Sequence, residues 1–444
     1  MGIFRKNRKK ILGTLAIVLL GGCMVFPSLA DENKKVTFDK NELELKVGET
    51  GKLKAELVTI TSPDIASGGV IFVSGEGNDD NAGAIDTPLL TVQAALDRAK
   101  PGDTVYLREG TYTGCNYFAS SGSKEGGYIT VTSYNGEKAV VTTKSGTSGA
   151  AFSLEGNDYI KIENLCISGL KAKDVYGVLM GGGESYVYIE NCEFSDIVTT
   201  SPGSKSTPGG SSNAILLFGE GKTAADSINH IYISNNKVHD NVNGWSENIS
   251  VAGNCEYVFV DSNLVYDCTN IGIDFYGNAE YCSDKSLDQP RHCECTGNVV
   301  YNCNSFYSEN AGIYVDGSYD ILVRENESYK NAYGIEVGSE EWRSYYADEN
   351  RVREITVCGN SIHDNTECGL RIGGWSNDST TGVVYNCTVC DNSFSSDGSD
   401  EIIISKCDSI YFKNNKFDSG LTYDDVVWYD DEIDSSKITN IFFE

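Results

Sequence analysis

Four copies of one short pattern carry the residues with the clearest potential for chemistry. The pattern is Gly-apolar-x-apolar-x-Gly/Ser, and its copies begin at Gly272, Gly312, Gly334 and Gly369. The third position carries Asp274, Tyr314, Glu336 and Arg371, and the fifth position of the first two copies carries Tyr276 and Asp316. Side chains two apart on a strand share a face, so these residues are predicted to form two neighbouring columns on one sheet.

Three interpretations fit these columns: a pair of catalytic carboxyls, a calcium site and a surface without a chemical role. Asp274 and Glu336 are predicted to lie two strands apart, roughly 10 Å, which leaves the room for water that an inverting glycosidase pair needs. Asp274 with Asp316 would equally suit a Ca²⁺ ion, which prefers carboxylate oxygens. The third interpretation is a solvated face with cross-strand ion pairs such as Glu336 with Arg371.

Long loops are predicted to wall this face. Segments 278–291, 339–352 and 375–385 follow three of the four patterns, and loops stacked on one edge of a sheet would turn its face into the floor of a groove. The wall candidates are Glu280, Asp284, Asp288, Arg291, Glu340, Glu341, Trp342, Arg343 and Trp375. The residues expected to bind a substrate are Tyr276, Tyr314, Asp288, Arg291, Trp342 and Trp375, with Asp274, Glu336 and Arg371 as the catalytic candidates.

A second repeat predicts the fold that positions these residues. Short alternating segments end in an Asn that recurs at positions 236, 263, 298, 326, 360, 392 and 415. Alternation indicates strands, and an Asn beside a turn suits a residue that tolerates the left-handed conformation and bonds its own backbone. Self-similarity at this period, without two-residue hairpin signals, predicts an all-β solenoid of parallel strands, a parallel β-helix.

The same register assigns side chains to the inside and outside of the solenoid. The residues two positions after the Asn should point inward; they are Val238, Val265, Val300, Ile362, Phe394 and Phe417. The next position should point outward, and it carries His239, Tyr266, Tyr301, Tyr329 and His363. This aromatic column either stabilises the sheet by stacking or offers a platform for sugars.

Cysteines also follow the register. Cys268 and Cys303 share one ladder position in neighbouring rungs, as do Cys358 and Cys390. Rungs roughly 4.8 Å apart permit disulfides, and buried thiol ladders are the alternative. A zinc site at Cys293-x-Cys295 or Cys387-x-x-Cys390 is disfavoured, because residues two apart on a strand lie about 7 Å apart.

The N-terminus predicts export. Residues 1–30 combine a basic start, an apolar run over 11–26 and a small-x-small site at 28–30, as in a signal peptide. A lipoprotein box that would lipidate Cys23 is the minor alternative. We expect a secreted monomer without a transmembrane segment after cleavage.

The acidity of the chain restricts its partners. The net charge is −29, and residues 1–30 hold five Lys or Arg and no acidic residue, so the exported chain would be still more acidic. A chain without a basic face is a poor ligand for nucleic acid. A polyanionic glycan would need a bridging cation, whereas export solubility alone also explains the charge.

The remaining segments define a leader and the start of the solenoid. Residues 31–68 resemble about a third of a bacterial Ig-like domain, too little for a core of its own. The solenoid is predicted over 69–444. Thr87 and Pro88 are expected to begin a capping helix with Leu89, Val92, Leu96 and Ala99 on its apolar face, and Pro101-Gly102 to end it.

This block, Asp86 to Tyr112, with Tyr128-Ile-Thr-Val-Thr-Ser-Tyr-Asn-Gly-Glu-Lys-Ala-Val140, resembles the start of the right-handed parallel β-helix proteins, most nearly the family-nine pectate lyases. The resemblance implies a pectin lyase-like solenoid and a polysaccharide lyase that uses Ca²⁺, an Asp-rich cluster and a Lys base. The predicted floor offers Arg371 but no lysine. Because of the resemblance, a polysaccharide lyase is the first expectation. A glycoside hydrolase using Asp274 and Glu336 is the alternative, and a non-catalytic glycan-binding protein is the third possibility.

Overall fold

The chain forms two units, which are described separately. The computed structural model describes residues 68–204, 209–306, 308–338, 351–374, 383–398, 400–418 and 420–444, and the backbone of two earlier strands. Unit one covers residues 1–65, and unit two covers 66–444. In unit one, β1 (Lys34–Phe38) pairs antiparallel with β2 (Ala55–Thr59). The predicted signal peptide and Cys23 lie outside the described residues.

Unit two consists of three long sheets whose strands are all parallel to their neighbours. The first sheet contains β3 (Val70–Val73), β4 (Thr104–Leu107), β7 (Ile129–Ser133), β10 (Ile160–Glu163), β14 (Ser185–Glu190), β18 (Ile228–Ser234), β21 (Cys255–Asp261), β24 (Arg291–Thr296), β27 (Tyr319–Arg324), β30 (Thr356–Cys358), β33 (Val384–Cys390), β36 (Cys407–Lys413) and β38 (Ile438–Phe443). The second contains β5 (Gly110–Thr113), β8 (Ala139–Thr142), β11 (Cys166–Ser168), β15 (Glu193–Ser195), β19 (Lys237–His239), β22 (Leu264–Cys268), β25 (Val299–Cys303), β28 (Glu327–Tyr329), β31 (Ser361–His363) and β34 (Ser393–Ser395). The third contains β6 (Asn116–Tyr117), β9 (Gly149–Ser153), β13 (Val175–Met180), β17 (Ser212–Gly219), β20 (Ile249–Gly253), β23 (Ile273–Tyr276), β26 (Ala311–Asp316), β29 (Tyr333–Gly338), β32 (Cys368–Ile372), β35 (Asp400–Ile404) and β37 (Val427–Tyr429).

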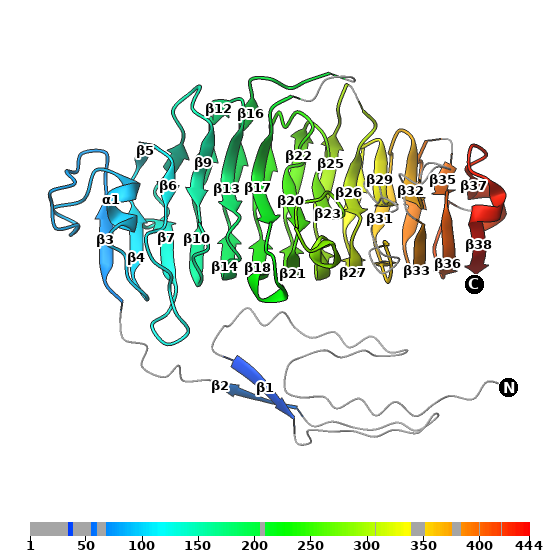
Figure 1. Cartoon of the computed structure of the whole chain (residues 1–444), viewed down its shortest axis with the longest axis horizontal. Coiled ribbons are helices and arrows are strands. Elements are labelled where there is room, and N and C mark those ends of the chain that lie inside the picture. Colours follow the sequence, from blue (N-terminus) through cyan, green and yellow to red (C-terminus); the bar gives the residue numbers. More distant parts are fainter. Residues whose placement is uncertain are drawn as a thin grey trace. The chain divides into compact units, whose positions relative to one another are not determined.

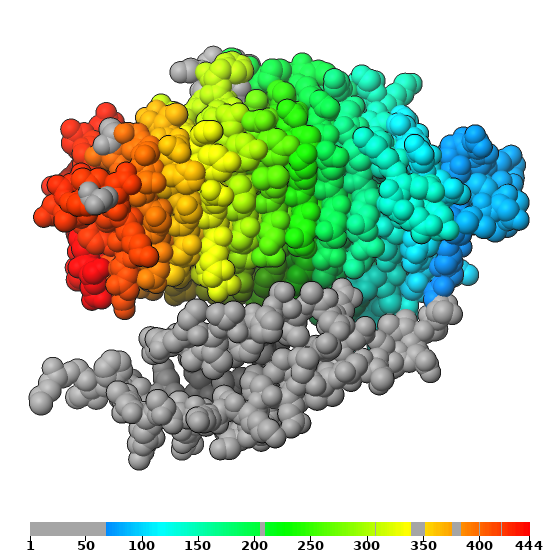
Figure 2. Space-filling model, turned by 180° about the vertical axis from the view of Figure 1, so that it is seen from behind, coloured from blue at the N-terminus to red at the C-terminus, as the bar shows by residue number. Residues whose placement is uncertain are grey.

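The chain visits the three sheets in turn and so builds a parallel β-helix. Each circuit adds one rung, and the rungs follow one another along the long axis of unit two (Figure 1). The surface accordingly shows successive bands of sequence from one end to the other (Figure 2). A small pair, β12 (Lys171–Ala172) with β16 (Val198–Thr199), and the short helices η1 (Ala224–Asp226), η2 (Lys285–Leu287), η4 (Ser435–Lys437) and α2 (Tyr423–Val426) complete the described elements.

The repeating asparagines form a ladder inside the solenoid. From Asn263 to Asn415, the side-chain Oδ1 of each ladder Asn accepts hydrogen bonds from the backbone N–H and the Nδ2 of the Asn one rung earlier. Each Nδ2 also donates to a backbone carbonyl, as from Asn298 to Val260 at 2.9 Å. The ladder thereby satisfies buried backbone groups where the strands turn a corner.

One expectation about these asparagines was wrong. The left-handed backbone belongs to the residue immediately before each ladder Asn, as at Ser262 (φ 55°) and Glu325 (φ 56°). The Asn side chain bonds to the neighbouring rungs and not to its own backbone. The turn tolerates Ser, Glu, Asp, Asn or Gly at the left-handed position, because the buried amide that follows anchors the corner.

The predicted inner and outer faces are confirmed. Val238, Val265, Val300 and Ile362 are fully buried, Phe394 nearly so, and Phe417 packs against the core while partly exposed. The core is therefore one continuous column of apolar side chains from rung to rung, as a solenoid requires.

The capping helix is present but shorter than predicted. α1 spans Val92–Leu96, and the hydroxyl of Thr91 caps it by accepting a hydrogen bond from the Ala94 N–H at 3.2 Å. Leu89 remains extended, because its N–H and C=O bond to Phe72 and Ser74 beside β3. Val92, Ala95 and Leu96 are buried, so the helix covers the apolar end of the first rungs.

Cysteine register is confirmed at both predicted positions. Cys268 pairs with Cys303, and Cys358 pairs with Cys390. The structure joins Cys358 and Cys390 as a disulfide and leaves Cys268 and Cys303 as buried thiols. Within the described residues, the one group of three His, Cys, Asp or Glu side chains with ligand atoms within 4.8 Å of one another is Cys358, Cys390 and Asp391. Its two sulfurs are those of the disulfide.

A second ladder ends in two buried acids. Asn365 Oδ1 accepts from the Asn331 N–H, and the next place is taken by Asp397, whose Oδ1 accepts from the backbone N–H and the Nδ2 of Asn365. Burial, with the neighbouring Asp397 carboxyl, raises the pKa of Glu401 to about 8, and burial also raises the pKa of Asp397. Glu401 therefore binds a proton more tightly in the folded than in the unfolded chain.

We expect this pair to make stability depend on pH. A carboxyl whose pKa is higher in the folded than in the unfolded chain stabilises the fold. This contribution is complete at a pH below the unfolded-state pKa and is lost as the pH rises through the folded-state pKa. The free energy of unfolding should thus fall between about pH 5 and pH 8. Glu401→Gln should raise it at pH 8 by about 1–2 kcal/mol and flatten the dependence, as measured by urea denaturation. Asp397→Asn should act in the same direction, and an unchanged pH slope in both variants would contradict the assignment.

Candidate functional site

The predicted column exists on the third sheet and lies in a cleft. Asp274 pairs with Tyr314, Tyr314 with Glu336, and Glu336 with Arg371, while Tyr276 pairs with Asp316. A cleft of about 630 Å³ opens over this part of the sheet. The parallel register brings together residues from β23, β26, β29 and β32 because each strand repeats the same alternation.

Three carboxylates on the cleft floor are almost completely covered. Asp274 and Asp316 are 2% exposed, and Glu336 is 6% exposed; all three line the cleft. Asp316 lies diagonally across the ladder from both Asp274 and Glu336, a separation of roughly 7–8 Å between Cα atoms. The burial argues against a merely solvated face, because a carboxylate is costly to remove from water unless it is paired or hydrogen-bonded.

Arg371 provides a positive charge beside the acids. Its Nε lies 3.9 Å from Glu336 Oε1, and its Nη2 lies 3.8 Å from Asp430 Oδ2. Its Nη1 donates to the hydroxyl of Tyr333, which donates to Glu309. Burial lowers the pKa of Arg371, but Glu336, Tyr333 and Tyr314 together outweigh this effect, and the net pKa lies above the ordinary value. Arg371 is therefore a permanent cation and a poor proton acceptor.

The described lining is acidic and contains no Lys, Arg or His. It includes five carboxylates, those of Glu247, Asp274, Glu309, Asp316 and Glu336. The four histidines of the chain, at 230, 239, 292 and 363, stack on outer aromatic columns away from the cleft. Among the described residues, proton transfer in the cleft would therefore fall to carboxyl or phenol groups.

The cleft walls come from loops on both edges of the sheet. The loop after β23 contributes Tyr281, whose ring lies 4.4 Å from that of Phe218 between centroids. The loops before β20 and β26 contribute Trp245, Glu247 and Glu309. Sequence reasoning considered the loops after the strands and missed those before them, although residues 241–248 and 304–310 also interrupt the repeat.

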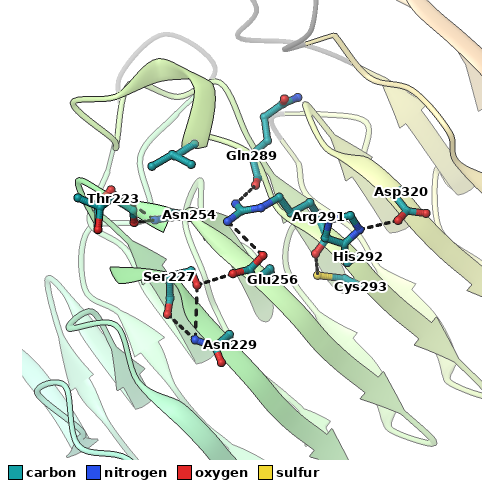
Figure 3. A network of polar contacts seen from close by, with 12 residues as sticks. Thr223, Ser227, Asn229, Asn254, Glu256, Gln289, Arg291, His292, Cys293 and Asp320 are labelled. Atoms are coloured by element: carbon teal, nitrogen blue, oxygen red, sulfur yellow. Dashed lines mark hydrogen bonds and ion pairs between the residues drawn. The ribbon is translucent and has the colours of Figure 1, made fainter. Parts of the chain in front are cut away.

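Two predicted substrate-binding residues lie elsewhere. Asp288 is fully buried inside its loop, where its carboxylate accepts from the Glu280 N–H at 2.7 Å. Arg291, in β24 of the first sheet, pairs with Glu256 at 3.3 Å and donates to the Gln289 carbonyl (Figure 3). Neither lines the cleft. Trp342, Trp375, Glu340, Glu341 and Arg343 lie outside the described residues.

The outward aromatic column is occupied by its own stacking. His239, Tyr266, Tyr301, Tyr329 and His363 form successive stacked pairs with centroids 4.7 to 5.1 Å apart. Their ring faces cover one another, so the faces that would contact a sugar are used within the protein. This favours the stabilising interpretation and leaves the cleft on the third sheet as the candidate site.

Fold and comparisons together define the class of protein. Residues 71–282 match a family model described as Pel9A-like, right-handed β-helix region, and residues 292–382 match one described as right-handed β-helix region. The chain is a right-handed parallel β-helix protein. Residues 71–282 are similar to the Pel9A-like family, in agreement with the resemblance of the N-terminal rungs.

Individual relatives agree with this class. The uncharacterized protein YwoF of Bacillus subtilis is 32% identical over 327 residues, which cover 70% of this chain and 65% of YwoF. Pectate lyase PEL9 of Emericella nidulans is 42% identical over 73 residues, 16% of this chain and 18% of that enzyme. The A-module of the mannuronan C-5 epimerase AlgE4 of Azotobacter vinelandii shares the fold, with a TM-score of 0.52 at 15% identity over 78% of this chain and 95% of the module. This chain thus spans less than two thirds of either curated relative.

Within the described residues, the short helices are neither long nor apolar enough to cross a membrane.

Proposed function

We propose that this protein is an exported enzyme that cleaves a polysaccharide in the cleft of the third sheet. The observation that carries the proposal is the group of three buried carboxylates, Asp274, Asp316 and Glu336, on neighbouring strands of an open cleft. The match to a pectate lyase-like family supports a glycan as the substrate. The N-terminal signal-like segment and the acidic composition support export.

Hydrolysis of a glycosidic bond is the reaction that the cleft supports best. In the inverting mechanism, one carboxyl protonates the leaving oxygen while the other removes a proton from the attacking water. We assign the base to Glu336, because the Arg371 cation favours an ionised carboxylate beside it. Asp274, two strands away in the same column, is assigned the acid.

β-Elimination is the second candidate, favoured by the similarity to pectate lyases. This reaction removes the proton α to a uronate carboxyl, whose charge must be neutralised. The donor atoms on the floor are hard oxygens of the kind that Ca²⁺ prefers, and Asp274 and Asp316 would hold the ion, which when bound would neutralise the uronate. Among described residues, however, the carboxylates of Asp274, Asp316 and Glu336 are not all within 4.8 Å of one another. Arg371 is too basic to serve as the proton acceptor.

A product assay separates the two reactions. Purified protein would be incubated with a panel of neutral and uronate polysaccharides, with calcium and with a chelator. New reducing ends without ultraviolet absorbance of an unsaturated uronate are expected, and they indicate hydrolysis. Absorbance that disappears with the chelator would establish the lyase reaction, and Asp274→Asn and Asp316→Asn should then weaken calcium binding. The absence of both products across the panel would overturn the enzyme proposal.

A further inference from the structure

The cleft floor changes character along the solenoid axis. In one column, Leu179 on β13 pairs with Leu216 on β17, Leu216 with Ser250 on β20, and Ser250 with Asp274. In the next column, Phe218 pairs with Ala252, and Ala252 with Tyr276. The floor toward the N-terminal rungs is thus apolar or uncharged, and the carboxylates begin only at β23.

A tryptophan stands at the edge of this uncharged part. Trp245 lines the cleft, is 42% exposed and donates from Nε1 to the Ser204 carbonyl at 3.1 Å. A Trp side chain combines a large apolar ring with a polar N–H, and such side chains are enriched at binding interfaces. On the opposite edge of the sheet, Tyr281 packs with Phe218 and Tyr276.

The loop that carries Trp245 is held in place from below. Asn213 and Asn243 both donate from Nδ2 to the Glu247 carbonyl, at 2.7 and 3.1 Å, and Asn270 donates to the Ser246 carbonyl at 2.9 Å. Gly244 has a φ of +72°, and a Cβ there would lie 2.6 Å from the Gly210 carbonyl oxygen. The loop therefore requires glycine before Trp245, and its position is determined before any ligand arrives.

We propose that the cleft over β13, β17 and β20, with Trp245 as its aromatic wall, is a subsite for uncharged sugar units, and that the substrate is a neutral polysaccharide bound lengthwise along the rungs. The statement that this polysaccharide is cleaved rests on the proposed function, whereas the statement that it binds in the subsite does not. The apolar ring face of a sugar would pack on Trp245 and the Leu216–Phe218 floor. The described lining has five carboxylates, and the Arg371 cation beside it is paired with Glu336, so an anionic glycan would meet a net negative surface and be repelled.

Binding is measured by calorimetry on the full-length protein carrying Asp274→Asn, which prevents turnover. The probes are oligosaccharides of glucose, xylose, mannose or galactose, and oligogalacturonate of equal length without added calcium. At least one neutral probe is expected to bind and oligogalacturonate to bind at least tenfold more weakly. Trp245→Ala should weaken neutral binding by about tenfold or more, and Trp245→Phe should retain most of it. Trp428→Ala, which removes an exposed Trp outside the described lining, is the matched control.

The outcomes distinguish this inference from the proposed reaction. Equal or tighter binding of oligogalacturonate, no binding of any neutral probe, or Trp245→Ala binding as well as the parent protein would each overturn the neutral-sugar subsite. If neutral probes bind through Trp245 but the wild-type protein cleaves none, the subsite stands and the enzyme proposal fails. If the wild-type protein cleaves a glycan and Trp245→Ala leaves KM unchanged, the reaction stands and the subsite is wrong. Circular dichroism of each variant verifies that it is folded.

Discussion

Asp274→Asn and Glu336→Gln are each expected to lower kcat for glycan cleavage by about 10²–10⁴-fold while the protein stays folded. Each change keeps the shape of the side chain and removes its ability to exchange a proton. The two variants should differ in pH dependence. Loss of the base, Glu336, removes the acidic limb of the kcat/KM profile, and loss of the acid, Asp274, removes the alkaline limb.

Chemical rescue distinguishes a base from a structural residue. Formate should restore part of the activity of Glu336→Ala, because a small carboxylate can replace the missing one in the cleft. Glu325→Gln, which changes an exposed acid outside the described cleft lining, should retain wild-type kcat. Full activity in Asp274→Asn or Glu336→Gln, or unchanged limbs of the pH profile, would contradict the roles assigned to them.

Asn298→Ala is expected to lower the free energy of unfolding by about 2–4 kcal/mol, the largest stability effect that we predict. Oδ1 of Asn298 accepts from the backbone N–H and the Nδ2 of Asn263, and its own Nδ2 donates to Val260 and Asn326. Alanine would leave the buried N–H of Asn263 and the Val260 carbonyl unsatisfied. Urea denaturation followed by circular dichroism measures the change.

The matched control is Asn304→Ala. Asn304 is exposed, and its Nδ2 donates to Asn302 and to the Lys330 carbonyl at the surface, where water can replace it. A loss of less than about 0.5 kcal/mol is expected. Equal denaturation midpoints for Asn298→Ala and Asn304→Ala would show that the ladder does not stabilise the corner as inferred.

The arrangement of residues on the cleft floor was accessible from sequence because it depends on register. A period of two assigns Asp274, Tyr314, Glu336 and Arg371 to one face, and a parallel ladder without bulges transfers that assignment from rung to rung. The same rule placed Val238 inside and Tyr266 outside. Hydrogen-bond roles were less accessible. The ladder Asn was recognised by its spacing, but its bonds run to the neighbouring rungs, and the partner Asn lies 23 to 35 positions away in sequence.

By itself, the sequence determined the solenoid, its inner and outer faces and the column of polar residues, since all of these repeat locally. Only the tertiary structure decided which loops form the walls. Asp288 and Arg291 are close to the cleft residues in sequence, yet one folds into its own loop and the other bonds across the first sheet. Trp245 and Glu309 precede their strands and still reach the cleft. A loop has no fixed period, so its position depends on the contacts of the whole rung.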